Sequence, residues 1–237
     1  MRVLTIVHEA AAGPGVFARV AARRGVGLVE WVPAEGSPPE GSLDATVGVL
    51  VLGGSMHPDQ ESEHPWLRGE KELIGGLLES GVPLLGVCLG AELLAEVAGG
   101  RSTRLPRPEI GWLETRLTQA GTKDPVLGGL PKRFVGFQWH SYACEPPPAT
   151  VPLGGGDGRL DAFRIGDAWG IQFHAEVTAE VLSRWLEGHR GDPDAVAAGF
   201  DPVPVRDQMP RCIPASERVG AKLFAAFLQL LTSRARS

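Results

Sequence analysis

Short apolar runs alternate with amphipathic segments through the first hundred residues. Most of the runs are bounded by glycine or polar residues, which is typical of strands buried in a parallel sheet. Between them, apolar residues recur every three or four positions, which predicts helices. The pattern predicts strands at residues 3–7, 27–32, 47–52 and 82–87, and helices at residues 16–23, at residues 66–78 and directly after residue 88, the last ending before Gly99-Gly100.

This order of elements predicts the fold class. Alternating strands and helices form an α/β fold of three layers, with a mainly parallel central sheet and helices on both faces (flavodoxin-like). The stretch GGGDG at 154–158 is interpreted as a turn, because neither a Lys-Ser/Thr pair nor a helical pattern follows it. Short strand-like runs then predict a small antiparallel extension in the second half, at residues 112–117, 134–139, 162–165 and 169–173.

The chain of 237 residues, 43% of them hydrophobic, is long enough for one α/β domain with a substantial core. No internal repeat is visible, so we expect residues 1–237 to form a single domain with a C-terminal helical extension from about residue 190. The remaining predicted elements are a Pro-rich loop at 33–42, helices at 177–189 and 215–234, an irregular Pro-rich stretch at 191–211 with a short helix and a surface loop, and a frayed end at 233–237.

Charge and cysteine content narrow the classes of function. Lys and Arg number 23 against 28 Asp and Glu, a net charge of -5 that gives no electrostatic basis for binding nucleic acid. The first apolar run breaks at His8-Glu9, too early for a signal peptide or a membrane span. Three cysteines at unrelated spacings do not indicate a disulfide framework. We therefore expect a cytoplasmic protein that binds neither nucleic acid nor a membrane.

Cys88 lies at the corner between a predicted strand and a predicted helix. Gly86 and Gly90 flank it to give G-x-C-x-G, the spacing of the nucleophile elbow G-x-S-x-G. Small neighbours allow a tight turn at such a corner, and the positive end of the helix favours a thiolate. On the local sequence alone a buried structural cysteine is an equal alternative, because cysteine is among the most buried residue types. A nucleophile requires a base elsewhere in the chain.

His174 and Glu176 supply a candidate base and its orienting acid. They are two residues apart on an extended segment, so both side chains leave the same face of the strand. That spacing lets a carboxylate orient an imidazole, which can activate a thiol. His140 is an alternative base, although no acid stands two residues from it.

These motifs together resemble the class I glutamine amidotransferases, a family with a Cys-His-Glu triad. The nucleophile segment is GVCLGAELLA, and the histidine and glutamate lie in GIQFHAEV. The segment VLVLGGSM resembles the family's oxyanion loop, and QWHSYACEPP resembles the segment that helps to hold glutamine. The resemblance covers roughly residues 45–180. EIGW at 109–112 and the C-terminal helix resemble stand-alone members more than domains fused to a synthetase.

The resemblance implies acyl transfer through a thioester at Cys88. His174 would protonate the departing ammonia and then activate water, while Glu176 holds His174. The two oxyanion donors would be the backbone N–H group of Leu89 and that of Gly54 or its neighbour. No cofactor and no metal are expected.

The resemblance also implies the substrate contacts, which are Gly53, Glu92, Ser141 and Tyr142. Two positions depart from the family pattern. Ser55 follows the two glycines where the family often has proline, and Glu92 stands where members commonly carry glutamine. One hypothesis is that the Glu92 carboxylate contacts the α-ammonium group of a glutamine-like substrate; an equal alternative is that Glu92 is a solvated helix residue.

Three functions remain open on the sequence. The first is a glutaminase that passes ammonia to a synthase subunit, the second is a γ-glutamyl hydrolase without a partner, and the third is a non-catalytic interaction subunit of the same fold. The substrate of either enzyme would be glutamine or a γ-glutamyl compound. A polar cluster beside the predicted site is expected to be a solvated, mobile flap rather than a metal site. It comprises His57, Asp59, Glu61, Glu63 and His64.

Overall fold

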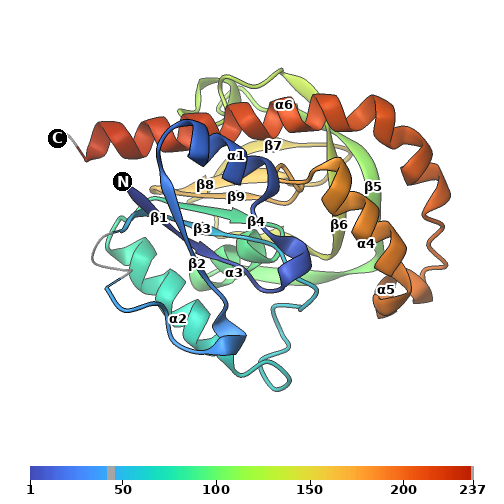
Figure 1. Ribbon diagram of the computed structural model, residues 1–237, viewed down its shortest axis with the longest axis horizontal. Helices are drawn as coiled ribbons and strands as arrows, with labels where there is room; N and C mark the ends of the chain where they lie inside the picture. The colour runs from blue at the N-terminus through green and yellow to red at the C-terminus, as the bar shows by residue number, and fades with distance from the viewer. Residues whose placement is uncertain (42–45, 236–237) are drawn as a thin grey trace.

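The structure is a computed structural model, and it describes residues 1–41 and 46–235 (Figure 1). Its strands are β1 (Arg2–Ile6), β2 (Gly27–Trp31), β3 (Thr46–Val51), β4 (Leu84–Val87), β5 (Arg101–Leu117), β6 (Arg133–Glu145), β7 (Val151–Gly155), β8 (Ala162–Ile165) and β9 (Ala168–Ile171). Its α-helices are α1 (Gly15–Arg23), α2 (Trp66–Glu79), α3 (Leu89–Val97), α4 (Ala179–Gly188), α5 (Pro193–Ala197) and α6 (Val203–Arg234).

All the described strands belong to one sheet, in the order β2-β1-β3-β4-β9-β8-β7-β5-β6. The first five run parallel, and their order is that of a flavodoxin-like sheet with β9 in the fifth position. From β9 outward every described pair is antiparallel. The α/β class with an antiparallel part in the second half is confirmed. That part holds the two longest described strands, β5 and β6, so it is more extensive than the sequence suggested.

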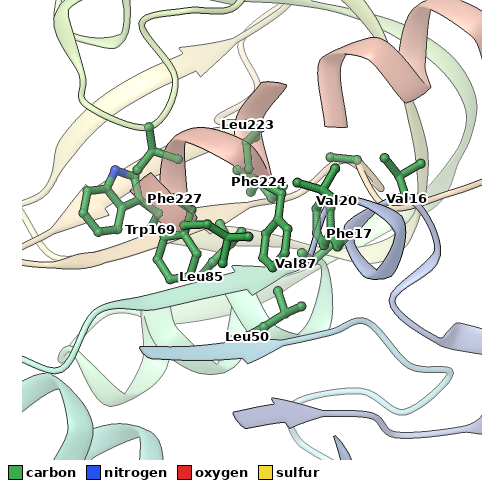
Figure 2. Close-up of a cluster of buried hydrophobic side chains, with 14 of the residues drawn as sticks. Val16, Phe17, Val20, Leu50, Leu85, Val87, Trp169, Leu223, Phe224 and Phe227 are labelled. Atoms are coloured by element: carbon green, nitrogen blue, oxygen red, sulfur yellow. The ribbon is translucent and has the colours of Figure 1, made fainter. Parts of the chain in front are cut away.

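Successive residues of the central strands point to opposite faces of the sheet, which gives the three layers. Val49 and Val51 of β3 face α2 and α3, whereas Leu50 faces α1 and α6. Figure 2 shows the second of these cores, where Leu50 and side chains of β4 and β9 meet residues of α1 and α6. The continuous apolar runs of these strands therefore reflect burial on both faces.

Helix α6 crosses one face of the sheet beside α1 (Figure 1). The predicted helix at 215–234 is correct, but α6 begins at Val203, so the expectation of an irregular chain through residue 211 is wrong there. The expected short helix before it is α5. Pro210 and Pro214 are tolerated because both lie on the exposed side of α6. There the carbonyl groups that lose a partner can meet water.

The structure differs from three smaller predictions. Strand β7 was not predicted, and it includes the first two glycines of the stretch at 154–158, of which only the remainder is a turn. The strand predicted at 112–117 begins at Arg101. The loop predicted at 33–42 contains a short 3₁₀ helix, Pro33–Glu35. Its last residue, Ser42, lies outside the described residues, as do the last two of the expected frayed end. No helix in the described ranges combines the length and the apolar character needed to span a bilayer.

Candidate active site

Cys88 occupies a sharp corner between β4 and α3. Its φ of 50° and ψ of -110° lie in a region that non-glycine residues rarely adopt. A Cβ at Gly86 would lie 2.5 Å from the carbonyl oxygen of Gly90, and a Cβ at Gly90 would lie 2.4 Å from that of Val51. Both contacts are far too short for any side chain, so the two glycines of the G-x-C-x-G motif are required for this corner. The strained backbone is a feature of functional sites, and it projects the thiol from the sheet.

Cys88, His174 and Glu176 meet at the carboxyl edge of the sheet. Nδ1 of His174 lies 2.7 Å from Oε1 of Glu176. The His174 ring also interacts with Cys88, whose thiol lies 3.6 Å from the carbonyl oxygen of Trp139. Each of the three residues is at most 5% exposed. The N–H of His174 donates to the carbonyl of Phe137 at 2.8 Å, which fixes the segment that follows β9. The arrangement has the geometry of a thiol, a base and an orienting acid.

Burial and neighbouring charges both shift the pKa values of Cys88 and His174. Burial by itself would lower the pKa of His174, but the charges of Glu176 and Cys88 and the hydrogen bonds to them hold it well above its ordinary value. Burial raises the pKa of Cys88, and the neighbouring His174 opposes that rise. The pKa of Cys88 is therefore raised overall, whereas the helix end was expected to lower it. When Cys88 is ionised, these charges favour a proton on His174, where departing ammonia would need it.

The loop after β3 lies against the same three residues. A Cβ at Gly53 would lie 2.9 Å from Cε1 of His174 and 3.3 Å from Cβ of Cys88, so only glycine leaves the ring and the thiol undisturbed. The N–H of Leu89 is the first of helix α3 and has no acceptor within the helix. Among the described residues, neither this N–H nor that of Gly54 has a recorded acceptor. Both residues line the cavity beside Cys88.

That cavity has a volume of about 320 Å³, within the usual range for small-molecule sites. Among the predicted substrate residues, Glu92 and Ser141 line it, together with Trp139. Gly53 borders the triad from the loop. Tyr142 does not line the cavity, and its hydroxyl donates to Asp59 at 2.7 Å instead.

Glu92 is a buried carboxylate in a short polar network. Its Oε1 accepts a hydrogen bond from Gln172 at 2.9 Å, and Gln172 in turn accepts from the thiol of Cys144 at 3.1 Å. Burial raises the pKa of Glu92 to about 7, against the opposing effects of His140 and Gln172. Glu92 therefore changes charge near neutral pH, one helical turn from the thiol.

His140, the alternative base, is engaged elsewhere. Its Nδ1 lies 2.8 Å from the carbonyl oxygen of Tyr142, and its Nε2 lies 3.3 Å from Glu109. Its two nitrogens thus face partners other than Cys88. The geometry favours His174 as the base.

The polar loop at 57–64, expected to be a mobile flap, contacts neighbouring elements at several points. His57 lies 3.1 Å from Asp194 of α5, and Asp59 accepts from Tyr142 of β6. Arg104 of β5 contacts both Asp194 and Tyr142. No group of three or more His, Cys, Asp or Glu side chains suited to a metal ion occurs in the described ranges.

His8 and Glu70 were not singled out in the sequence, although they lie next to the loop beside the triad. His8 follows β1 and contacts Gly53 through its imidazole, while Glu70 of α2 lies on the other side of the ring. The position of His8 in the sequence could have indicated it, because it stands at the carboxyl end of a parallel strand, where ligand sites collect. Glu70 gave no signal, since an acid within an amphipathic helix ordinarily faces water.

Comparisons with known proteins agree on one family. The model of the family described as glutamine amidotransferase class-I matches residues 19–187. A GMP synthase (glutamine-hydrolyzing) of Aeropyrum pernix is 34% identical over 185 residues, which are 73% of this chain and 34% of that protein. The putative glutamine amidotransferase-like protein YfeJ of Salmonella typhimurium is 27% identical over 79% of this chain and 80% of its own length.

Two solved structures share the fold over nearly the whole chain. A glutamine amidotransferase of Thermotoga maritima superimposes with a TM-score of 0.85 and 27% identity, covering 98% of this chain and 97% of that one. A glutamine amido transferase of Methylobacillus flagellatus gives 0.84 with 24% identity, covering 96% and 94%. The chain thus spans about a third of the Aeropyrum protein but nearly all of these two structures.

Proposed function

The chain belongs to the class I glutamine amidotransferase family, and on that premise we propose that it hydrolyses the side-chain amide of glutamine through a thioester at Cys88. The observation that carries the proposal is the contact of Cys88, at a strained strand-to-helix corner, with His174, whose other ring nitrogen lies 2.7 Å from Glu176. The same three residues were singled out by their spacing in the sequence. A thiol that served only to pack the core would not need this corner.

In the proposed reaction, Cys88 gives its proton to His174, and the resulting thiolate attacks the amide carbon of glutamine, whose carbonyl oxygen becomes an oxyanion. The N–H groups of Gly54 and Leu89 stabilise that charge. Protonated His174 then gives its proton to the amide nitrogen, the C–N bond breaks and ammonia leaves. Neutral His174 next takes a proton from water, whose oxygen attacks the thioester and releases glutamate. Glu176 holds the imidazole throughout.

Substrate recognition is proposed to rest on the cavity beside Cys88. Glu92 would contact the α-ammonium group, and Ser141, which also lines the cavity, would contribute polar contacts. The side chain of Tyr142 supports this arrangement indirectly, by holding Asp59 of the neighbouring loop. A γ-glutamyl compound shares the same reacting group, so direct γ-glutamyl hydrolysis is the second candidate. The intact triad favours either enzyme over a non-catalytic interaction subunit.

The test combines active-site labelling with turnover. A glutamine-analogue electrophile should label Cys88 stoichiometrically and faster than Cys144. Cys144 is equally buried but does not line the cavity, and burial holds its pKa well above the ordinary value. Cys88→Ala should abolish both the labelling and the release of glutamate from glutamine, while Cys144→Ala serves as the matched control. Inert Cys88, or faster labelling of Cys144, would reject the proposal.

A synthase subunit that receives the ammonia is proposed as the partner. The Aeropyrum relative is a GMP synthase more than twice as long as the matching region, and subunit HisH of the Moorella thermoacetica imidazole glycerol phosphate synthase is 30% identical over 65% of this chain. Purification of the tagged chain from its native host tests this. A co-purifying synthase that raises glutamine turnover supports a partner, and full activity of the chain alone supports the γ-glutamyl hydrolase.

A further inference from the structure

His8 and Glu70 form a buried pair behind the loop that carries Gly53 and Gly54. Nε2 of His8 lies 3.0 Å from both carboxylate oxygens of Glu70, and neither side chain is exposed to solvent. Nδ1 of the same ring lies 3.1 Å from the carbonyl oxygen of Gly53. The ring also stacks on Trp66, with 5.6 Å between ring centroids. One imidazole therefore connects helix α2 to the loop beside the triad.

The partners of the imidazole fix where its hydrogen lies. The carbonyl of Gly53 can only accept a hydrogen bond, so Nδ1 must be protonated to make this contact. The second proton of the pair lies between Nε2 and the Glu70 carboxylate, which leaves Nδ1 a donor in either position. Burial alone would lower the pKa of His8, but Glu70, the Gly53 carbonyl and the charge of Glu9 together raise it.

The contact of His8 with the Gly53 carbonyl also sets the direction of the Gly54 N–H. The peptide group between Gly53 and Gly54 is trans, so its C=O and N–H point in opposite directions. Because the C=O is turned toward His8, the N–H of Gly54 is turned away from it. Gly54 lines the cavity with Cys88, and its N–H has no recorded acceptor in the part of the chain that the structure describes.

Two further contacts keep this loop from rotating. A Cβ at Gly54 would lie 2.7 Å from Cβ of His8, so the loop and the histidine are packed as closely as glycine permits. The hydroxyl of Ser55 donates to Glu9 at 3.0 Å. This hydrogen bond restrains the loop at the position where many family members have proline. Residues directly after β1 thus hold all three residues of the Gly53-Gly54-Ser55 sequence.

We propose that His8 and Glu70 are positioning residues that hold the Gly53–Gly54 peptide with its N–H toward the oxyanion. The inference rests on the proposed function, because it assigns the pair to oxyanion stabilisation in that reaction. Without the pair, the Gly53 carbonyl would be free to turn, and the peptide could present an oxygen instead of an N–H to the developing negative charge. Losing one oxyanion donor typically lowers kcat by about 10²–10³-fold.

The decisive variant replaces both members, because a lone buried Glu70 charge would endanger the fold. The double variant His8→Phe with Glu70→Leu keeps an apolar ring on Trp66 and removes the hydrogen bond to Gly53. Glu70→Gln is the conservative variant, because a glutamine N–H can donate to Nε2 of neutral His8 while Nδ1–H still reaches Gly53. Glu72→Gln, at an exposed site on the same helix, is the matched control.

The readout separates oxyanion stabilisation from general damage. We expect the double variant to lose about 10²–10³-fold in kcat for glutamine with little change in KM. Its Cys88 should react with iodoacetamide within about twofold of the wild-type rate, because displacement at a CH₂ group develops no carbonyl oxyanion. Glu70→Gln should keep most of the activity. A folded double variant with wild-type kcat, or an equal loss in the iodoacetamide rate, would overturn the proposal.

Two additional measurements test the roles of His8 and Glu70 by other routes. If the wild type does not hydrolyse glutamine, the proposed function fails, but the burst of nitrophenol from p-nitrophenyl acetate still reports acylation of Cys88 and can be compared between variants. If the double variant does not fold, the ¹⁵N spectrum of His8 in the wild type decides. A protonated Nδ1 between pH 6 and 9 supports the pair, and a bare Nδ1 contradicts it.

Discussion

Glu92 is the residue whose charge bears most directly on the thiol. It lies one helical turn after Cys88, lines the cavity, and has a pKa of about 7 because it is buried. Its carboxylate also contributes to the raised pKa of Cys88. An ionised Glu92 therefore opposes thiolate formation, while the proposed contact with a substrate ammonium group requires that same charge.

We predict that Glu92→Gln separates these two effects. KM for glutamine should rise about tenfold or more above pH 7, since a hydrogen bond to a charged group contributes ~1.5–3 kcal/mol. The acidic limb of kcat/KM should move to lower pH, because a carboxylate that raises the pKa of Cys88 is gone. In the wild type, KM should rise as the pH falls below about 7, where Glu92 becomes neutral.

The matched control is Glu79→Gln, the same change at an exposed site at the end of α2. KM measured from pH 6 to 8.5 decides the matter. An unchanged KM in Glu92→Gln, with no movement of the acidic limb, would show that Glu92 has no part in binding or in the ionisation of Cys88.

Some of these residues can be recognised from the sequence alone, and others cannot. Cys88, His174 and Glu176 could be picked out because each stands in a local pattern, a glycine-flanked corner or a pair two residues apart on a strand. His8 and Glu70 are 62 residues apart, and their meeting depends on how α2 packs beside β1. Partners joined only by tertiary packing leave no local pattern to detect.

At the scale of elements, the loop after β3 is held closed by the short helix α5. The Asp194 carboxylate pairs with His57 of the loop and with Arg104 of β5. It also accepts a side-chain hydrogen bond from Ser141. Among these contacts, that of His57 with Asp194 joins the loop to α5, and because it is partly exposed it stabilises the closed loop by up to about 1 kcal/mol. The helix itself is capped by Asp192, which also accepts a hydrogen bond from Trp139 of the cavity wall.

We predict that Asp194→Ala makes opening of this loop up to about five times more frequent, as a loss of about 1 kcal/mol implies. Amide hydrogen exchange at residues 54–64 should accelerate by that factor, and KM should rise more than kcat falls. Asp207→Ala, at an exposed site on α6, is the control. Unchanged exchange in this segment would show that contacts other than Asp194 hold the loop.

Elements were predictable where burial leaves a regular pattern. The parallel strands and α1 to α3 emerged because their faces are packed against other layers, so apolar spacing follows the geometry. The predicted strand at 112–117 is shorter than β5 because Pro106 and Pro108 interrupt the strand pattern before it. In the structure β5 continues through both prolines, with an irregular register against β6. The start of α6 was missed for the same reason, since proline weakens a helical reading even where it faces water.

At the scale of the whole molecule, α6 is part of the core and not an appendage. Leu223, Phe224 and Phe227 are fully buried, and Phe227 packs against Trp169 of β9 with 6.2 Å between ring centroids. Figure 2 shows these side chains directed at the sheet from one side, with α1 beside them. The expected helical extension from about residue 190 therefore covers a face of the central sheet that would otherwise be exposed.

We accordingly propose that residues 1–237 form one cooperative domain, and predict that Phe227→Ala lowers the free energy of unfolding of the entire protein by about 3–5 kcal/mol. Because α6 fills the same core as β3, β4 and α1, loss of its packing should destabilise all layers together. Far-UV circular dichroism and tryptophan fluorescence should then melt at one lowered temperature, since Trp169 lies in this core and Trp66 lies on the other face. Gln229→Ala, on the exposed side of α6, should leave that temperature within about 1–2 °C of the wild type, as surface changes cost little. Separate transitions for the two probes would instead mean that α6 unfolds on its own and that the chain contains more than one cooperative unit.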